Sequence, residues 1–430
     1  MALRSRELSA VKHVTDALDR LAADPYNTVI TLDDRALERA AALDAELAAG
    51  RWRGPLHGVA VGVKDLIDVA GLPTRCGSLV FADAPPAAAD APVVARLLEA
   101  GAVVVAKLHT HEFAYGPTGD VAATGPARNP HDPSRITGGS SSGSAAAVAA
   151  GHLALALGTD TGASVRTPAA LCGVVGLKPA YGHLSAEGAF PLAESLDTVG
   201  LLTADVHSAS VAWDVLDRPD GTGGGIQQPG VRGLRVGVPT DAYWQPADPS
   251  IGVVVAAAVE RLRGAGAEVV EVATPMIDEL AATYPVIVGA EAWATHAEAF
   301  EKTPELFQPI TRERLAPNAS LPARAYVDAV RTRRRLVAAM RAALDVDVLV
   351  LPTTRLRATP IGAETVSVDG ADVPVRPSML GLTLPFNLTG WPAASVPGPV
   401  GAGELPVGVQ VVGVRLEERG VLRVAAALHP

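Results

Sequence analysis

The sequence predicts an α/β fold, with a large mixed, mostly parallel and twisted β-sheet that is covered by helices on both faces. Of the 430 residues, 48% are hydrophobic and 19% are charged, which supplies enough apolar material for an extensive core. Short apolar runs next to Gly and Pro indicate buried strands. These runs alternate with segments of helical spacing, and that rhythm is typical of β-α-β units.

Residues 1–50 are expected to be largely helical. Residues 5–23 and 34–49 place apolar residues at helical spacing among charged ones. Thr31 or Asp33 could cap the second of these helices with a side-chain oxygen.

The first β-α-β unit follows this segment. Residues 58–63 form an apolar run that predicts a short buried strand with Lys64 at its end. Residues 92–101 predict a helix, and residues 102–106 predict another buried strand.

Two polar loops that contain Gly are each expected to open a helix. Residues 129–143 are rich in Pro, Gly and Ser and pass into an Ala-rich helix at about Ser144. Residues 158–163 lead into a second helical segment near Ser164.

A polar, Gly-rich stretch at residues 217–230 predicts a surface loop and the best candidate for a subdomain boundary. The apolar pattern after it predicts the remaining elements. They are, in order, strand 234–238, helix 251–263, strand 268–272, a long helical region through Ala343, strands 347–352 and 408–413, and helix 417–428.

Charge and composition exclude several kinds of partner and location. The chain carries 36 basic and 46 acidic residues, a formal net charge of −10, so neither nucleic acid nor an anionic membrane is an expected partner. The start lacks a secretory signal, and the Ala-rich run 145–157 is too short to span a bilayer. We therefore expect a soluble, cytoplasmic protein. Cys76 and Cys172 cannot form a disulfide framework and are expected to be buried.

The first polar loop contains Thr137-Gly-Gly-Ser-Ser-Ser-Gly-Ser144, which is compatible with a phosphate site, a nucleophile or a simple helix cap. A phosphate loop requires a Gly-Lys-Ser/Thr ending, and none follows. The motif Gly-x-Ser-x-Gly centred on Ser141 would fit a hydrolase elbow, but that motif follows a buried strand, and residues 129–136 are not expected to form a strand.

The second polar loop places Ser164 where a helix begins. Several free backbone N–H groups could there point at an oxyanion beside the hydroxyl, as acyl transfer requires. A Ser that only caps the helix is the alternative that the loop by itself leaves open.

Three ordered segments resemble the signature of the amidase-signature hydrolases: Gly138-Gly-Ser-Ser-Ser-Gly-Ser-Ala, Gly158-Thr-Asp-Thr-Gly-Ala-Ser-Val-Arg-Thr-Pro-Ala and Cys172-Gly-Val-Val-Gly-Leu-Lys-Pro. Pro352-Thr-Thr, Phe386-Asn-Leu-Thr-Gly-Trp-Pro and Leu405-Pro-Val-Gly-Val-Gln are similar to later parts of that family. The resemblance covers nearly the whole chain. It implies one domain over residues 1–430, with a helical start at 1–50, a signature core at 55–205 and a C-terminal part at 231–430 that completes the sheet.

By position, the resemblance implies that Ser164 is the acylated nucleophile, Ser140 a bridging serine and Lys64 the general base. The two serines lie 24 residues apart, as in the family. The family holds the bridging serine with a cis peptide bond. The resemblance also implies an oxyanion hole, which is made by the backbone N–H groups of Thr161, Gly162, Ala163 and Ser164.

The implied mechanism requires an uncharged lysine, because a protonated amine cannot accept a proton. Burial of Lys64 against apolar strand residues would favour this form by lowering its pKa. Ser140 would donate to Lys64 and accept from Ser164, so that a proton passes from the nucleophile to the base and later to the leaving amine. No metal or cofactor is expected.

Two positions depart from the commonest family pattern. Ser142 stands where a Gly is usual, and Ala163 replaces the Gly before the nucleophile. An Ala costs little at negative φ but is strained at positive φ. The reaction class is therefore expected to persist, and the shape of the acyl pocket is left open.

Other polar residues near these motifs are expected to be structural. His109, His111 and Glu112 lack a further ligand that the sequence could identify, so they do not predict a metal site. Asp160 and Arg166 flank the nucleophile and are expected to tie the loop together by hydrogen bonds.

The leading hypothesis is a free-standing amidase that cleaves a small carboxamide, with a homodimer left open. An alternative is the glutaminase (A) component of a tRNA-dependent amidotransferase, although the region 200–345 looks short and lacks recognisable glutamine-binding residues. A catalytically silent binding protein is a third class, which the intact Lys64, Ser140 and Ser164 argue against.

Overall fold

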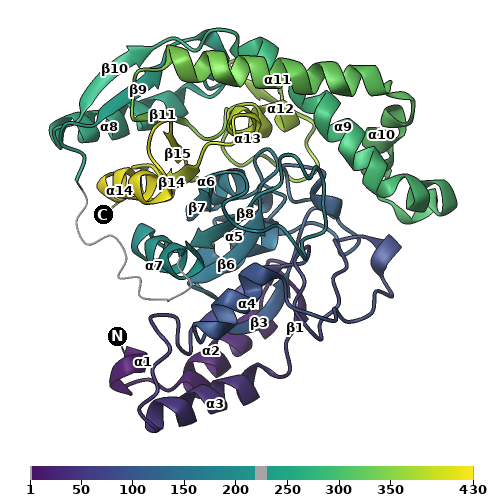
Figure 1. Cartoon of the computed structure of the whole chain (residues 1–430), viewed down its shortest axis with the longest axis vertical. Coiled ribbons are helices and arrows are strands. Elements are labelled where there is room, and N and C mark those ends of the chain that lie inside the picture. The colour runs from purple at the N-terminus through teal and green to yellow at the C-terminus, as the bar shows by residue number, and fades with distance from the viewer. Residues whose placement is uncertain (1, 218–229, 430) are drawn as a thin grey trace.

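An eleven-stranded sheet runs through the computed structural model, which describes residues 2–217 and 230–429 (Figure 1). The strand order is β1-β3-β2-β6-β8-β7-β14-β15-β11-β9-β10. The bounds of these strands are β1 Val29–Leu32, β2 Ala60–Lys64, β3 Val103–Leu108, β6 Leu155–Thr159, β7 Val175–Lys178, β8 Val199–Thr203, β9 Arg235–Pro239, β10 Glu268–Val272, β11 Val348–Pro352, β14 Ala393–Pro397 and β15 Gly408–Gly413. Two small hairpins are separate, β4 Arg128–Asn129 with β5 Asp132–Ile136, and β12 Thr365–Val368 with β13 Ala371–Pro374.

Helices surround this sheet. Their bounds are α1 Ala2–Ser5, α2 Ala10–Ala22, α3 Ala36–Ala48, α4 Pro92–Glu99, α5 Ser142–Ala149, α6 Arg166–Cys172, α7 Val206–Asp217, α8 Pro249–Gly264, α9 Ile277–Lys302, α10 Pro309–Leu315, α11 Ala323–Ala343, α12 Val375–Leu380, α13 Leu384–Leu388 and α14 Glu418–Leu428. Short 3₁₀ turns lie at Leu79–Phe81, Glu112–Ala114, Ala242–Trp244, Pro304–Leu306 and Ala316–Ser320. In Figure 1, α2 and α3 lie at the bottom, and α9 to α11 lie at the top.

The predicted large mixed α/β sheet is confirmed, with one correction to its strand directions. Among the described strands, four neighbouring pairs are parallel and six are antiparallel, so the sheet is not mostly parallel. The parallel pairs β2–β3 and β9–β10 have a helix in their connection, α4 and α8 respectively. Helical crossovers are what parallel neighbours require, whereas β14 and β15 follow each other without one and pair antiparallel.

The expectation that residues 1–50 are largely helical is confirmed, since α1, α2 and α3 make up most of this segment. The segment also contains the strand β1, which was not expected; it sits at the sheet edge against β3 and is only four residues long. Thr31 lies inside this strand, whereas Asp33 does accept a hydrogen bond (3.0 Å) from the backbone N–H of Arg35 at the start of α3. The expectation that residues 129–136 do not form a strand was wrong: they lie in the β4–β5 hairpin, although this hairpin lies outside the main sheet.

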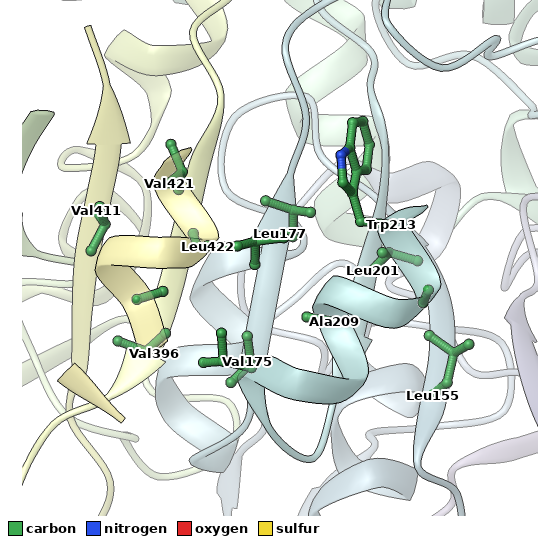
Figure 2. Packing of buried hydrophobic residues seen from close by; sticks show 14 of the residues in the cluster. Leu155, Val175, Leu177, Leu201, Ala209, Trp213, Val396, Val411, Val421 and Leu422 are labelled. Carbon is green, nitrogen blue, oxygen red and sulfur yellow. The ribbon is translucent and has the colours of Figure 1, made fainter. Parts of the chain in front are cut away.

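The sheet is buried on both faces because successive side chains alternate between two apolar clusters. Val61 and Val63 of β2 belong to one cluster, and Ala60 of the same strand belongs to the other. Figure 2 shows the first cluster, where strand residues such as Leu177 and Leu201 pack against Trp213 of α7 and α14 packs beside them. This confirms the prediction that helices cover both faces.

The carboxyl ends of β2 and β6 lie side by side, since these strands are parallel neighbours. Lys64 ends β2, and Thr159 ends β6. In open α/β sheets such an edge is where ligands usually bind. The predicted surface loop at 217–230 falls almost wholly outside the described residues and stays a prediction, as does the division into one domain. Over the described ranges, no helix is both long and apolar enough to cross a membrane.

Candidate active site

Lys64 is fully buried at the end of β2 and donates hydrogen bonds to two hydroxyl groups. Its Nζ donates to Oγ of Ser140 at 2.6 Å and to Oγ1 of Thr159 at 2.8 Å. Burial lowers the pKa of Lys64 to about 7, although the charges of Asp160 and Asp197 act in the opposite direction. Burial therefore shifts Lys64 toward its uncharged form.

Ser140 is fixed by its backbone. The peptide bond between Gly139 and Ser140 is cis, which agrees with the expectation from the family. The carbonyl of Ser140 accepts from the backbone N–H groups of His111 at 3.1 Å and of Ser142 at 2.8 Å. These contacts hold the hydroxyl of Ser140 beside Lys64.

Ser141 joins the two polar loops. Its backbone N–H donates to the carbonyl of Ser164 at 3.1 Å, and its hydroxyl donates to the carbonyl of Thr159 at 3.2 Å. The same hydroxyl accepts from the N–H of Thr159 at 3.3 Å. Because this hydroxyl is buried and engaged in loop structure, the elbow alternative with Ser141 as nucleophile finds no support.

Ser164 lies two residues before α6 and does not cap it. The carboxylate of Asp160 accepts from the N–H groups of Val165 at 3.1 Å and of Arg166 at 3.4 Å instead. Asp160 thus takes the capping role, and the hydroxyl of Ser164 is left to line a narrow pocket. Within the described residues no hydrogen bond joins this hydroxyl to that of Ser140, and such contacts often tighten only with substrate bound.

Four consecutive backbone N–H groups next to this hydroxyl have no acceptor in the described part of the chain, those of Thr161, Gly162, Ala163 and Ser164. Ala163 does not adopt a positive φ, so the departure from Gly causes no backbone strain here. A Cβ at Gly162 would lie 2.2 Å from the phenol oxygen of Tyr284, so any larger residue there would require Tyr284 to shift. These four N–H groups can therefore donate hydrogen bonds to an anionic oxygen of a bound substrate.

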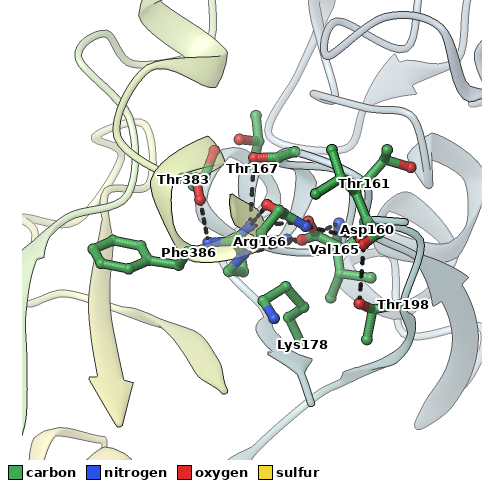
Figure 3. A network of polar contacts seen from close by, with 12 residues as sticks. Asp160, Thr161, Val165, Arg166, Thr167, Lys178, Thr198, Thr383 and Phe386 are labelled. Carbon is green, nitrogen blue, oxygen red and sulfur yellow. Dashed lines mark hydrogen bonds and ion pairs between the residues drawn. The ribbon is translucent and has the colours of Figure 1, made fainter. Parts of the chain in front are cut away.

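Asp160 and Arg166 tie the second loop to the C-terminal half (Figure 3). Arg166 donates to both carboxylate oxygens of Asp160, at 2.9 and 3.0 Å, which confirms the predicted pairing. It also donates to the carbonyl of Thr383, to Gln410 and to Asn387. Burial acts to raise the pKa of Asp160, but the Arg166 guanidinium, together with the charge of Lys178 and the hydrogen bond from Asn387, lowers the pKa to about 2.

Asp197 is a member of the site that sequence reasoning missed. It accepts hydrogen bonds from the hydroxyl of Thr161 and from the backbone N–H groups of Leu192 at 2.9 Å and Ala193 at 3.1 Å. Burial raises its pKa to about 6. No local sequence pattern identifies Asp197, because the residues near it, in the second polar loop and around Lys64, come from other parts of the chain.

The other expected structural residues take part in hydrogen bonds of the fold. His109 contacts the hydroxyl of Ser142 at 2.7 Å, which gives that unusual Ser a partner, and Glu112 accepts from Ser78 at 2.7 Å. Among the residues with described positions, no group of three His, Cys, Asp or Glu side chains is arranged to hold a metal ion. Cys76 and Cys172 are fully buried, as predicted.

Comparison with known proteins gives the class of this chain. The sequence model of the amidase family matches residues 12–422. The chain is 38% identical over 409 residues to AtzE, a component of the 1-carboxybiuret hydrolase of Pseudomonas sp. (strain ADP), covering 92% of this chain and 89% of that protein. It is also 38% identical to the A component of the glutamyl-tRNA(Gln) amidotransferase of Symbiobacterium thermophilum, covering 98% and 93%.

A solved structure described as an amidase superposes with a TM-score of 0.91 at 40% identity, over 99% of this chain and 97% of that one. The chain belongs to the amidase family. It is accordingly a hydrolase that acts on carbon–nitrogen bonds of amides, as the resemblance predicted.

Proposed function

We propose that this chain hydrolyses a small carboxamide through an acyl-enzyme on Ser164, with Ser140 as proton relay and neutral Lys64 as base. The observation that carries the proposal is the 2.6 Å contact between Nζ of buried Lys64 and Oγ of Ser140. The N–H groups without acceptors beside Ser164 support it independently.

The steps follow from these positions. The Ser164 hydroxyl attacks the amide carbon while its proton passes through Ser140 to Lys64. The N–H groups of residues 161–164 stabilise the oxyanion, and the C–N bond breaks as the amine takes the proton back along the same path. Water then hydrolyses the ester, which releases a carboxylic acid and restores Ser164.

The glutaminase of an amidotransferase is a second candidate, because one of the relatives with 38% identity is the A component of a glutamyl-tRNA(Gln) amidotransferase. Release of ammonia from small amides by the isolated chain, in preference to glutamine, would favour the free-standing amidase. A silent binding protein would release ammonia from neither. The cytoplasmic location and the homodimer stay predictions.

The test is covalent labelling of the purified chain with a fluorophosphonate, followed by localisation of the adduct by mass spectrometry. We expect the adduct on Ser164, and Ser164→Ala should abolish it. Ser141→Ala is the matched control, because that serine is adjacent to Ser140 but has a structural role here, and it should still be labelled at Ser164. An adduct on Ser141 would reject the proposed mechanism.

A further inference from the structure

Two cavities meet next to Ser164 and differ greatly in size. The narrow pocket that Ser164 lines has about 20 Å³ of space, which is enough for about one water molecule or a methyl group. The neighbouring cavity has a volume of about 430 Å³, within the range of roughly 300–1,000 Å³ that is usual for small-molecule sites. Ala114, Thr161 and Leu192 belong to both linings. A substrate at Ser164 therefore has room for a large group on one side of the scissile bond only.

The large cavity lies on the side of the base. Thr159 lines it, and the hydroxyl of Thr159 accepts a hydrogen bond from Nζ of Lys64 at 2.8 Å. The cavity wall at Phe190 is joined to the segment that follows Lys64, because the N–H of Phe190 donates to the carbonyl of Leu66 at 2.8 Å. Thr159 does not line the narrow pocket. The large cavity is thus the one beside the catalytic base.

The position of the base decides which part of the substrate enters the large cavity. In the proposed mechanism Lys64 returns a proton through Ser140 to the leaving nitrogen. That nitrogen must face the two groups of this relay, so a substituent on it points toward the cavity beside them. The narrow pocket at Ser164 is left for the acyl part.

The wall of the large cavity is fixed by contacts within the chain. The ring of Phe190 packs against those of Phe81 and Phe113, with centroid distances of 5.3 and 5.6 Å. The hydroxyl of Tyr181, another lining residue, donates to the carbonyl of Glu194 at 2.8 Å. The cavity is therefore formed before a substrate binds, as is usual for ligand sites.

The charge of the same wall restricts the group that fits. Glu187, Glu194 and Asp197 line the cavity, and none of its described lining residues is basic. A negatively charged group would be repelled there, whereas an uncharged or cationic amine would not.

We propose that the substrate is an N-substituted amide of a short acyl group, formyl or acetyl, whose uncharged or cationic amine occupies the large cavity. This inference rests on the proposed function. Ser164 forms the short-chain ester as the C–N bond breaks, and the amine leaves into the cavity with the proton that Lys64 returns through Ser140. Water then hydrolyses the ester to the short carboxylic acid.

The test compares N-butylacetamide with its isomer hexanamide, which carries the same alkyl extension on the acyl side. Release of acetate and of hexanoate by the purified chain is the measurement. We expect kcat/KM to be at least about tenfold higher for N-butylacetamide, because only the large cavity binds the butyl group. N-acetylglycine, whose leaving group carries a carboxylate, should be hydrolysed more slowly than N-butylacetamide.

A variant that fills the large cavity tests the assignment to the leaving side. Ala186 lines this cavity and is half-buried, so Ala186→Phe places a ring in the space without replacing a core residue. We expect it to lower kcat/KM for N-butylacetamide about tenfold more than for acetamide, whose leaving group is ammonia. Ala186→Ser adds little volume and should keep the wild-type ratio. The matched control is Ala41→Phe, at an exposed position of α3 near the bottom of Figure 1, which should also keep that ratio.

A kcat/KM for hexanamide or N-acetylglycine that equals or exceeds that for N-butylacetamide would overturn the inference. So would an equal loss for N-butylacetamide and acetamide in Ala186→Phe. Fluorophosphonate labelling separates the two levels of failure. Labelling of Ser164 without a preference for N-butylacetamide, or without its turnover, rejects this inference alone. The absence of both labelling and turnover of every amide rejects the proposed function and the inference with it.

Discussion

At the scale of single residues, the chemistry depends on one lysine that is kept from water. An exposed lysine has a pKa near about 10.4 and is charged at neutral pH. Lys64 is fully buried at a strand end, and burial brings its pKa to about 7. The surrounding hydroxyls of Ser140 and Thr159 give its nitrogen partners without fixing a charge on it.

The pH dependence of turnover follows from this lysine. Below a pKa of about 7 Lys64 is protonated and cannot accept a proton, so kcat/KM should rise with pH and level off above that value. Lys64→Ala should lower kcat at neutral pH by at least about 10²-fold, since general base catalysis supplies that much. Stopped assays of ammonia release across pH, with circular dichroism to verify folding, are the measurement. A profile that is flat through pH 7, or a variant that keeps most of its activity, would reject Lys64 as the base.

Asp197 should tune the same profile. Its carboxylate favours the charged form of Lys64 and so raises the pKa of the lysine. Asp197→Asn removes that charge, and we expect the rising limb of kcat/KM to move to lower pH. Glu194→Gln is the matched control, because Glu194 lines the same cavity but is exposed and screened by water, and it should leave the limb in place. A limb that stays fixed or moves to higher pH in Asp197→Asn would contradict this role.

At the scale of elements, the buried ion pair between Asp160 and Arg166 stabilises the second polar loop. Removing one partner of a buried pair leaves the other charge unpaired, so Asp160→Asn should lower the free energy of unfolding by about 3 kcal/mol or more. Denaturation in urea measures it. Glu298→Gln, which breaks an exposed pair with Lys302 on α9, is the control and should leave stability unchanged. An equal loss of unfolding free energy in Asp160→Asn and Glu298→Gln would contradict a larger contribution of the buried pair.

Acid should act on this same pair in a defined window. The pKa of Asp160 is depressed from 3.8 to about 2, so its contribution is present above pH 3.8 and is lost as pH falls toward 2. Asp160→Asn should therefore flatten the decline in stability between these values. A parallel decline in both proteins would mean that other carboxylates dominate acid unfolding.

The elements that sequence could predict are those with a clear local pattern. Strands 268–272 and 408–413 match β10 and β15 at both ends, and Lys64 ends its strand as expected. β14 was missed because its Ala, Ser and Pro residues have no apolar pattern of their own, and it is buried by its neighbours β7 and β15. The Lys64–Ser140 contact was predictable from the family resemblance, whereas Asp197 is brought to the site by tertiary packing alone.

At the scale of the whole molecule, the site is shared by both halves of the chain. Lys64, Ser140 and Ser164 lie in the first half, but Arg166 behind Ser164 is held by Thr383 and Gln410 of the second. The main sheet also continues from the first half of the chain into the second, because β7 pairs with β14. In Figure 1 the C-terminal strands and α13 lie against α6 and β7.

This sharing predicts that neither half can fold into an active unit alone. If the chain is cut within residues 218–229, the N-terminal fragment would expose the edge of β7 and deprive Arg166 of its C-terminal partners Thr383, Gln410 and Asn387. We expect each fragment alone to lack a cooperative unfolding transition and to resist fluorophosphonate labelling, because exposed strand edges and unpaired buried polar groups are unfavourable. Co-expressed fragments should assemble and recover both properties. The intact chain is the reference for each measurement. An N-terminal fragment that unfolds cooperatively and is labelled at Ser164 by itself would show that residues 1–217 form an independent domain, against the single domain predicted from the sequence.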